Sequence, residues 1–116
     1  MAVTSVANGN QVAVIGAEHT LFTSSAAGVY VFAVAIPSTF VNGDVVELRI
    51  YSVINGATEQ LAYYAVYAHQ QGPSSTGSVK YSVPVPTATA GDTLRFTLKQ
   101  TAGSGRTFPY RISTIG

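Results

Sequence analysis

Two hydrophobic patterns recur along the chain, and both are typical of β-strands. Residues 45–54 alternate strictly, with apolar side chains on one face and Glu47 and Arg49 on the other. This period of two is the signature of a strand that is buried on one side. Residues 29–36 carry no charge and are apolar on both faces. Such a strand must be covered on both sides, by this chain or by another one.

The same patterns predict further strands at regular spacing. Residues 58–69 follow the hairpin signal Asn55-Gly56 and are again apolar on both faces. Pro84 lacks a backbone N–H group, so we expect the strand that contains it to lie at a sheet edge. The remaining strands are predicted over residues 19–24, 79–86, 93–100 and 107–115.

These strands together predict the fold class. No segment longer than one turn has the hydrophobic period of a helix. About eight short strands separated by Gly and Asn turns predict an all-β chain, and we expect a β-sandwich of the jelly-roll type. A chain of 116 residues has the size of one domain, so we expect residues 1–116 to form a single domain. Within it, the turn signal Asn8-Gly9-Asn10 predicts an N-terminal hairpin or arm over residues 1–15.

Charged residues are scarce, which restricts the classes of function. They make up 9% of the chain, against about 25% in an ordinary soluble domain, whereas 47% of the residues are hydrophobic. Either partners cover much of the surface, or the surface is polar through Ser, Thr, Gly and Gln, and composition leaves both interpretations open. The net charge is +1 and the six cations are scattered, which argues against a nucleic-acid partner.

Three absences in the sequence narrow the context further. There is no cysteine, which excludes disulfides and thiolate metal sites. No apolar run approaches the ~18 residues of a membrane helix, so we expect no membrane partner. The first residues have neither the basic start nor the apolar core of a secretory signal, so we expect the protein to stay where it is made unless a larger assembly carries it out.

Candidate catalytic residues are few and poorly placed for chemistry. The histidines are His19 and His69, and no Gly-x-Ser-x-Gly elbow is present to supply a nucleophile. Glu18 and His19 are neighbours on a predicted strand, so they point to opposite faces and do not chelate together easily. The five carboxylates show no convincing spacing for a glycosidase pair. We therefore expect no enzymatic activity, no metal and no cofactor.

Tyr63 and Tyr67 share one face of the strand predicted over residues 58–69. A pair of exposed tyrosine rings can stack on sugars, as in lectins and carbohydrate-binding modules. Tyrosine is also enriched in subunit interfaces and is frequent in cores. A glycan-binding module of a phage tail or head fibre is therefore the alternative function.

Several segments of the chain resemble small structural proteins encoded in tailed-bacteriophage gene clusters. These segments are residues 27–31 (AGVYV), 42–50 (NGDVVELRI), 61–63 (LAY) and 97–110 (TLKQTAGSGRTFPY). The resemblance spans residues 19–115 in outline, and its motifs mark turns rather than a binding site. Some proteins of this size and style are capsid decoration, or cement, proteins. That class is β-rich, often trimeric, and binds the outer capsid lattice near local three-fold axes without doing chemistry.

The resemblance implies a non-enzymatic virion structural protein that stabilises a phage head from outside. It would be made in the host cytoplasm and located on the capsid surface. We expect it to form a homotrimer and to bind the major capsid protein, because several weak contacts act together on a lattice. The residues expected in the subunit contact are Val29, Val31, Ala33 and Ala35, or Tyr63 and Tyr67. The residues expected to contact the capsid lie in the N-terminal arm and include Ala2, Val3, Thr4 and Val6.

Overall fold

The chain folds into β-strands, as the sequence predicts. The computed structural model describes residues 2–73, 76–88 and 91–116, and these residues contain nine strands and no helix. In chain order the strands are β1 (Val3–Val12), β2 (Glu18–Ser24), β3 (Gly28–Ile36), β4 (Val45–Val53), β5 (Gln60–Ala68), β6 (Ser78–Tyr81), β7 (Val85–Thr87), β8 (Thr93–Ala102) and β9 (Thr107–Ile115).

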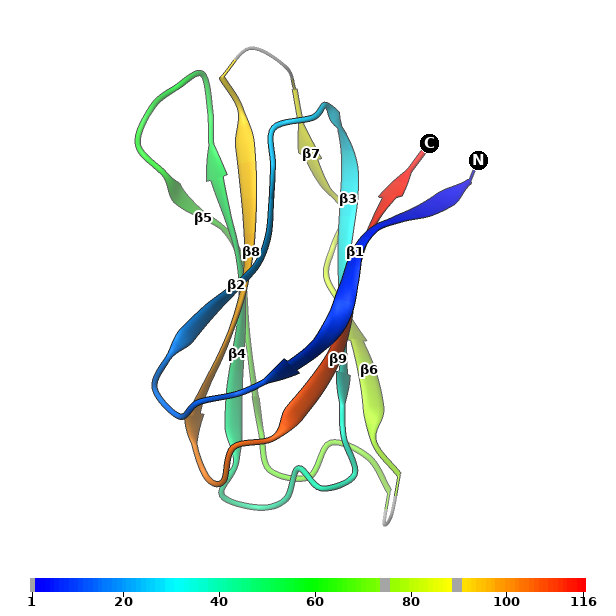
Figure 1. Ribbon diagram of the computed structural model, residues 1–116, viewed down its shortest axis with the longest axis vertical. Helices are drawn as coiled ribbons and strands as arrows, with labels where there is room; N and C mark the ends of the chain where they lie inside the picture. Colours follow the sequence, from blue (N-terminus) through cyan, green and yellow to red (C-terminus); the bar gives the residue numbers. More distant parts are fainter. Residues whose placement is uncertain (1, 74–75, 89–90) are drawn as a thin grey trace.

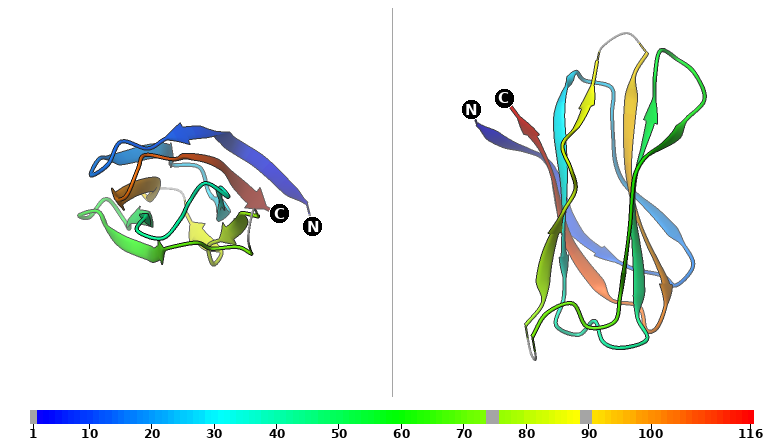
Figure 2. Two further views of the ribbon diagram at one scale, coloured as in Figure 1. Left: turned by 90° about the horizontal axis from the view of Figure 1, so that it is seen from below. Right: turned by 180° about the vertical axis from the view of Figure 1, so that it is seen from behind.

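The strands form two antiparallel sheets that pack face to face (Figures 1 and 2). Sheet A has the order β1-β9-β3-β6, and β7 also pairs with β3. Sheet B has the order β2-β8-β4-β5. The prediction of an all-β sandwich is therefore confirmed.

The strand pairing is nested, which is the arrangement of a jelly roll. The first strand, β1, pairs with the last, β9, and β2 pairs with β8. Further inward, β3 pairs with β6 and β7, and β4 pairs with its neighbour β5 across the hairpin. Successive pairs belong alternately to sheet A and sheet B. The chain is thus one long antiparallel hairpin rolled into two layers, as the predicted jelly roll requires.

The single strand predicted over residues 79–86 is divided into β6 and β7, which share one place beside β3. Pro84 lies in the break between them, where its missing N–H group leaves no gap in a ladder. Ser82, the first residue of the break, donates its backbone N–H to the carbonyl of Phe32 at 2.8 Å. Its hydroxyl accepts the N–H of Phe32 at 2.9 Å. One residue therefore satisfies both backbone groups of Phe32.

The predicted N-terminal hairpin is wrong, because β1 runs without a turn through Asn8-Gly9-Asn10 and pairs with β9 along its length. Gly9 does not form a turn but leaves room for a close contact with a side chain of β9. A Cβ atom at Gly9 would lie 3.1 Å from the hydroxyl oxygen of Tyr110 and 3.3 Å from its ring carbons. A glycine inside a strand often marks such a close approach. Val3–Val12 thus form an edge strand of the sandwich and not a free arm.

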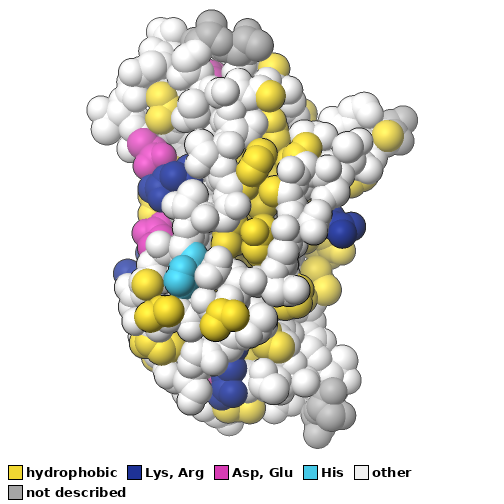
Figure 3. Space-filling model, in the orientation of Figure 1, with side chains coloured by type: hydrophobic (Ala, Val, Ile, Leu, Met, Phe, Trp, Pro, Cys, Tyr) yellow, Lys and Arg dark blue, Asp and Glu magenta, His cyan; other side chains and the backbone are white. Residues whose placement is uncertain are grey.

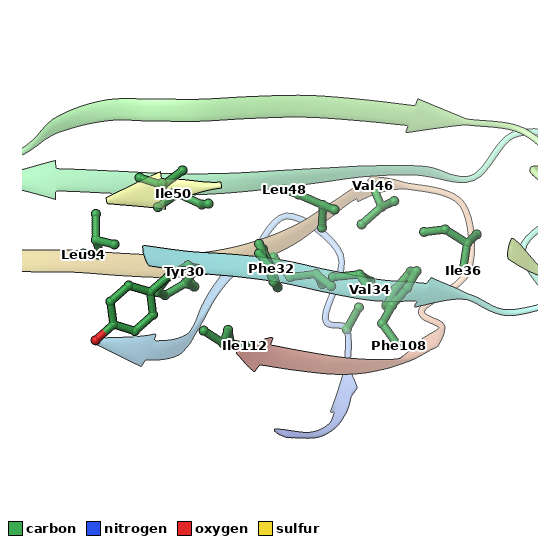
Figure 4. Close-up of a cluster of buried hydrophobic side chains, with 14 of the residues drawn as sticks. Tyr30, Phe32, Val34, Ile36, Val46, Leu48, Ile50, Leu94, Phe108 and Ile112 are labelled. Atoms are coloured by element: carbon green, nitrogen blue, oxygen red, sulfur yellow. The ribbon is translucent and has the colours of Figure 1, made fainter. Parts of the chain in front are cut away.

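The core lies between the two sheets and is built from the inward faces predicted for β3, β4 and β8. Phe32 and Val34 of β3 point toward Leu48 and Ile50 of β4 in Figure 4. Phe32 also meets Phe96 of β8 edge to face, with ring centroids 5.7 Å apart. Fully burying one such side chain contributes roughly 1.5–3 kcal/mol. The core therefore supplies the main attraction that holds the two layers together.

Two buried polar side chains tie the loops at one end of the sandwich to this core. Gln100 is fully buried and donates its amide to the carbonyls of Ala102 (3.0 Å) and Ser104 (2.7 Å). Its side-chain oxygen accepts the N–H of Arg106 at 3.0 Å. Asp44, also buried, accepts the guanidinium of Arg106 at 2.9 Å. The β8–β9 loop is thereby fixed to the start of β4.

We expect the substitution Asp44→Asn to lower the free energy of unfolding at pH 7 by about 2 kcal/mol. Burial raises the pKa of Asp44, but the N–H of Val41, the guanidinium of Arg106 and the N–H of Ser104 together hold it below its usual value of 3.8. The ionised form is thus favoured in the folded state. Its contribution to stability is complete above that usual value and is lost as the pH falls through the depressed pKa.

Urea unfolding of the wild type and of Asp44→Asn between pH 7 and pH 2 measures this effect. The difference in stability between the two proteins should shrink as the pH falls. Asp92→Asn is the matched control, because Asp92 accepts one N–H, from Asn55 at 2.7 Å, in an exposed turn. A difference between wild type and Asp44→Asn that stays constant down to pH 2 would contradict the assigned role.

Candidate interaction surface

The outer face of sheet A carries an apolar groove, which we call the sheet A groove. Its floor consists of small side chains on β3, and its walls are taller side chains on β6 and β9. Ala33 of the floor is opposite Tyr81 of β6 and Arg111 of β9 in the strand register. The hollow measures about 540 Å³. The floor residues are Val31, Ala33 and Ala35, and the wall residues are Val79, Tyr81, Pro109 and Arg111.

The sheet A groove exists because β3 is apolar on both faces. The side chains of one face fill the core, so those of the other face point outward and are only half-buried. Val79 and Tyr81 of the neighbouring β6 are 52% and 69% exposed. Arg111 is the one charged residue on this outer face, within the part of the chain that the structure describes. Water therefore contacts an unusually apolar sheet surface here.

The outer face of sheet B has the opposite character. Six of the eleven charged residues of the chain lie on it, three acidic and three basic. In Figure 3 acidic and basic side chains lie next to one another on the side that sheet B occupies. The six residues are Glu18, Glu47, Glu59, Arg49, Arg95 and Lys99.

Glu18 and Arg95 organise one half of the charged surface of sheet B. The carboxylate of Glu18 accepts the hydroxyls of Tyr51 and Thr97, each at 2.7 Å. Arg95 donates two hydrogen bonds to Glu59, at 3.1 and 2.9 Å, and lies 4.3 Å from the ring centre of Tyr51. Burial raises the pKa of Glu18, but the hydrogen bonds from Thr97 and Tyr51 together lower it by more. The pKa of Glu18 therefore lies below its usual value. This carboxylate is therefore a poor proton donor near neutral pH.

Arg49 organises the other half in the same manner. Its guanidinium contacts Glu47 at 2.6 Å and lies 4.8 Å from the ring centre of Tyr64. The hydroxyl of Tyr64 in turn donates to Glu47 at 3.3 Å. Burial lowers the pKa of Arg49, yet the hydrogen bond and the negative charge of Glu47 raise it above its usual value. The charges on sheet B thus neutralise one another in place, and the surface is suited to contact with water.

The structure brings together only some of the residues predicted for the subunit contact. Val29, Val31, Ala33 and Ala35 lie side by side on the outer face of β3. Tyr63 and Tyr67 are on the inner face of β5, partly buried against the core. Lys80 of β6 lies 5.1 Å from the ring centre of Tyr67. The two tyrosines therefore share no surface with the residues of β3.

The same placement does not fit the predicted sugar-stacking platform. A platform needs ring faces that are open to solvent, and Tyr63 and Tyr67 pack inward. The sequence left open whether these tyrosines lie in a platform, an interface or the core, and the reason is definite. Both faces of β5 carry tyrosines, so the alternation does not indicate which face points inward. The outward positions are occupied by Tyr64 and Val66, which are 47% and 46% exposed.

The residues predicted to contact the capsid are all exposed at the start of the chain. Ala2, Val3, Thr4 and Val6 lie at the beginning of sheet A's edge strand β1. The two chain ends lie together (Figure 2), and Ala2 and Gly116 exchange backbone hydrogen bonds of 3.1 and 2.9 Å. The start of β1 therefore pairs with the end of β9, and the two chain ends project together from the body of the sandwich (Figure 1).

The two histidines lie apart, His19 in β2 and His69 just after β5, and both accept backbone hydrogen bonds. His19 accepts the N–H of Val14 at 3.1 Å, and His69 accepts that of Gly43, also at 3.1 Å. Among the described residues, no group of three or more His, Cys, Asp or Glu side chains is placed to hold a metal ion. Within the same residues, no helix is long and apolar enough to cross a membrane.

A second apolar hollow of about 530 Å³ lies between the start of β5 and the segment that joins β6 to β7. Sequence reasoning missed this hollow and also missed the role of Tyr81 and Arg111 as walls of the sheet A groove. The alternation of residues 107–115 places Arg111 on the outer face of β9, but only the strand order shows that Ala33 lies between Arg111 and Tyr81.

We expect Tyr63 to ionise late in an alkaline titration. Burial and the hydrogen bond with Tyr67 raise the pKa of Tyr63 to about 12 from its usual 10.0. Because the neutral phenol is favoured in the folded state, its contribution to stability is complete below pH 10 and is lost as the pH rises through about 12. In an ultraviolet titration of tyrosinate, Tyr63→Phe should remove this late ionisation, whereas Tyr81→Phe should leave it in place. Loss of an ionisation near pH 10 in Tyr63→Phe would show that the ring is open to solvent.

Comparison of the chain with protein-family models, with curated proteins and with solved structures gave no match in any of the three. A jelly roll carries many unrelated functions, so the fold alone does not indicate which one this protein has. The two outer faces of the sandwich are therefore the observations from which function is argued.

Proposed function

We propose that the protein is a non-enzymatic structural protein of a virion, a capsid decoration protein that self-associates and stabilises a phage head by binding its outer surface. The single observation that carries the proposal is the difference between the two outer faces of the sandwich. Sheet B presents mutually neutralised charges to water, and sheet A presents the apolar sheet A groove. Contiguous apolar surfaces of this kind mark sites of contact with a partner.

The size of the outer face of sheet A is adequate for a stable protein contact. The molecule measures 45 × 32 × 19 Å, and sheet A occupies one of its long sides (Figure 1). Such a side accommodates the about 800 Å² per partner that a standard interface buries. Each square ångström of apolar surface removed from water contributes about 25 cal/mol before the cost of association. Burial of the groove therefore supports self-association.

The exposed start of β1, which lies beside the end of β9, supports the proposed attachment to a capsid. Residues 2–6 are exposed. The outer edge of β1 has no strand beside it among the described residues, and β1 contains no charge and no proline. Open edges of this composition pair readily with an extended segment of another protein. In this proposal the segment belongs to the major capsid protein.

Self-association is tested by placing a charge on each outer face in turn. Ala35→Lys puts an ammonium group on the floor of the sheet A groove, and Val66→Lys puts the same group on the exposed outer face of β5. We expect the wild type and Val66→Lys to share one oligomeric mass and Ala35→Lys to be a monomer of 12.1 kDa. Light scattering behind a sizing column measures the masses, and circular dichroism checks that both variants remain folded. A wild-type monomer at every concentration would overturn self-association.

Attachment is tested by co-sedimentation with empty capsid shells of the phage that carries this gene. The double substitution Thr4→Lys/Val6→Lys blunts the open edge of β1 without removing the strand, because an edge lysine hinders strand addition. We expect this variant to keep its oligomeric mass and to lose at least ten-fold in affinity for the shells. Lys99→Ala, on the opposite sheet, is the control that should bind normally. Undiminished binding of the double variant would reject the role of β1.

A further inference from the structure

Three of the six cations of the chain lie over tyrosine rings. Arg95 lies over Tyr51, Arg49 lies over Tyr64 and Lys80 lies over Tyr67, with distances of 4.3, 4.8 and 5.1 Å to the ring centres. Such cation–π contacts are most favourable when water is excluded from them. Each is made within one chain, between residues of neighbouring strands or of facing sheets.

Of the other three cations, Arg106 pairs with Asp44. Neither Lys99 nor Arg111 has a hydrogen bond, an ion pair or a ring contact of its side chain within the described residues. Lys99 has carboxylates opposite it in the strand register, whereas Arg111 is opposite Asn8 and Ala33. Among the exposed tyrosines of the described residues, one also lacks such a contact. Tyr81 is 69% exposed, and within the same residues its ring and hydroxyl contact no polar or charged partner.

These two unpartnered side chains lie in one row across the sheet A groove. Tyr81 of β6 and Arg111 of β9 are the two residues opposite Ala33, one on each side of it. Neighbouring strands are about 4.8 Å apart, so the two backbones are separated by about 10 Å. The tyrosine ring and the guanidinium therefore stand as opposite walls above an alanine of the floor.

We propose that the occupant of the sheet A groove is the same face of a second copy, related by a two-fold axis that runs along β3. This axis exchanges the two walls, so that Tyr81 of each copy stacks on Arg111 of the other. The contact is isologous, because each residue meets its complement by symmetry. The inference deepens the proposed function and rests on its claim of self-association. It also gives a dimer in place of the trimer expected from the sequence.

Arg111 is the reason why a second copy fits better than an unrelated apolar surface. An unpaired guanidinium is costly to bury, so an occupant has to supply a carboxylate or an aromatic ring at its position. The chain's own carboxylates are engaged elsewhere: Glu18, Glu47 and Glu59 on sheet B, and Asp44 and Asp92 in the loops. The ring of Tyr81 remains, and the two-fold axis brings it to the required place.

The first experiment measures the dimer dissociation constant by sedimentation equilibrium. Each of Tyr81→Ala and Arg111→Ala removes both reciprocal contacts, so we expect either substitution to weaken the dimer about 30-fold. Tyr81→Phe keeps the ring and should stay within about three-fold of the wild type. Lys99→Ala, which removes a cation from sheet B, is the matched control and should leave the dimer unchanged.

The decisive experiment mixes the two alanine variants. A homodimer of either variant has no intact contact, but a heterodimer retains one, between Tyr81 of the Arg111→Ala chain and Arg111 of the Tyr81→Ala chain. We expect native mass spectrometry to show the heterodimer well above its statistical share of one half. A statistical mixture would overturn the reciprocal pairing, because general burial on this face does not distinguish the three species.

The outcomes separate this inference from the proposed function. A wild-type dimer that Tyr81→Ala and Arg111→Ala do not weaken would overturn the pairing and leave self-association standing. A stable trimer would overturn the two-fold axis but would still support self-association. A monomer at all concentrations would overturn both.

Discussion

β3 lies in the middle of sheet A and has to be covered on both faces, and the rest of the structure depends on this constraint. Its inner face, with Phe32 and Val34, packs on sheet B and organises the core (Figure 4). Its two edges are occupied by β9 on one side and by β6 and β7 on the other. Its outer face is left to solvent as the floor of the sheet A groove. One apolar strand therefore contributes both to the core and to the apolar surface that we propose binds a partner.

The distribution of charge follows from the same constraint. A chain with 9% charged residues can keep only part of its surface well hydrated. Here six of the eleven charged residues are placed on the outer face of sheet B, where carboxylates, guanidinium groups and tyrosines contact one another. Ion pairs at a protein surface add little stability, in the range of about 0–1 kcal/mol each. Their physical effect is to make one face hydrophilic while the opposite face remains apolar.

Much of the fold could be predicted from the sequence, because a period of two is a direct consequence of strand geometry. The alternation in β4 and β8 correctly predicted their buried faces, and β3 is a strand as its apolar run predicted, although the run did not indicate which of its faces enters the core. The prediction failed where one signal had two physical causes. Gly9 looked like a turn residue but makes room for the ring of Tyr110. Tyr63 and Tyr67 looked like a surface pair, because both faces of β5 are similar in composition.

The sheet A groove lay beyond sequence reasoning for a different reason. Tyr81 and Arg111 are 30 positions apart in the chain, and only the nested pairing of a jelly roll brings both beside Ala33. An apolar sheet face also carries a risk, since it attracts any other apolar surface. A lone guanidinium in the wall of the groove opposes such contacts, because a partner without a ring or a carboxylate leaves a buried charge unpaired. In the proposed dimer Arg111 therefore has two effects. It contributes attraction to the correct partner, and it penalises the others, so that one face can be both apolar and selective.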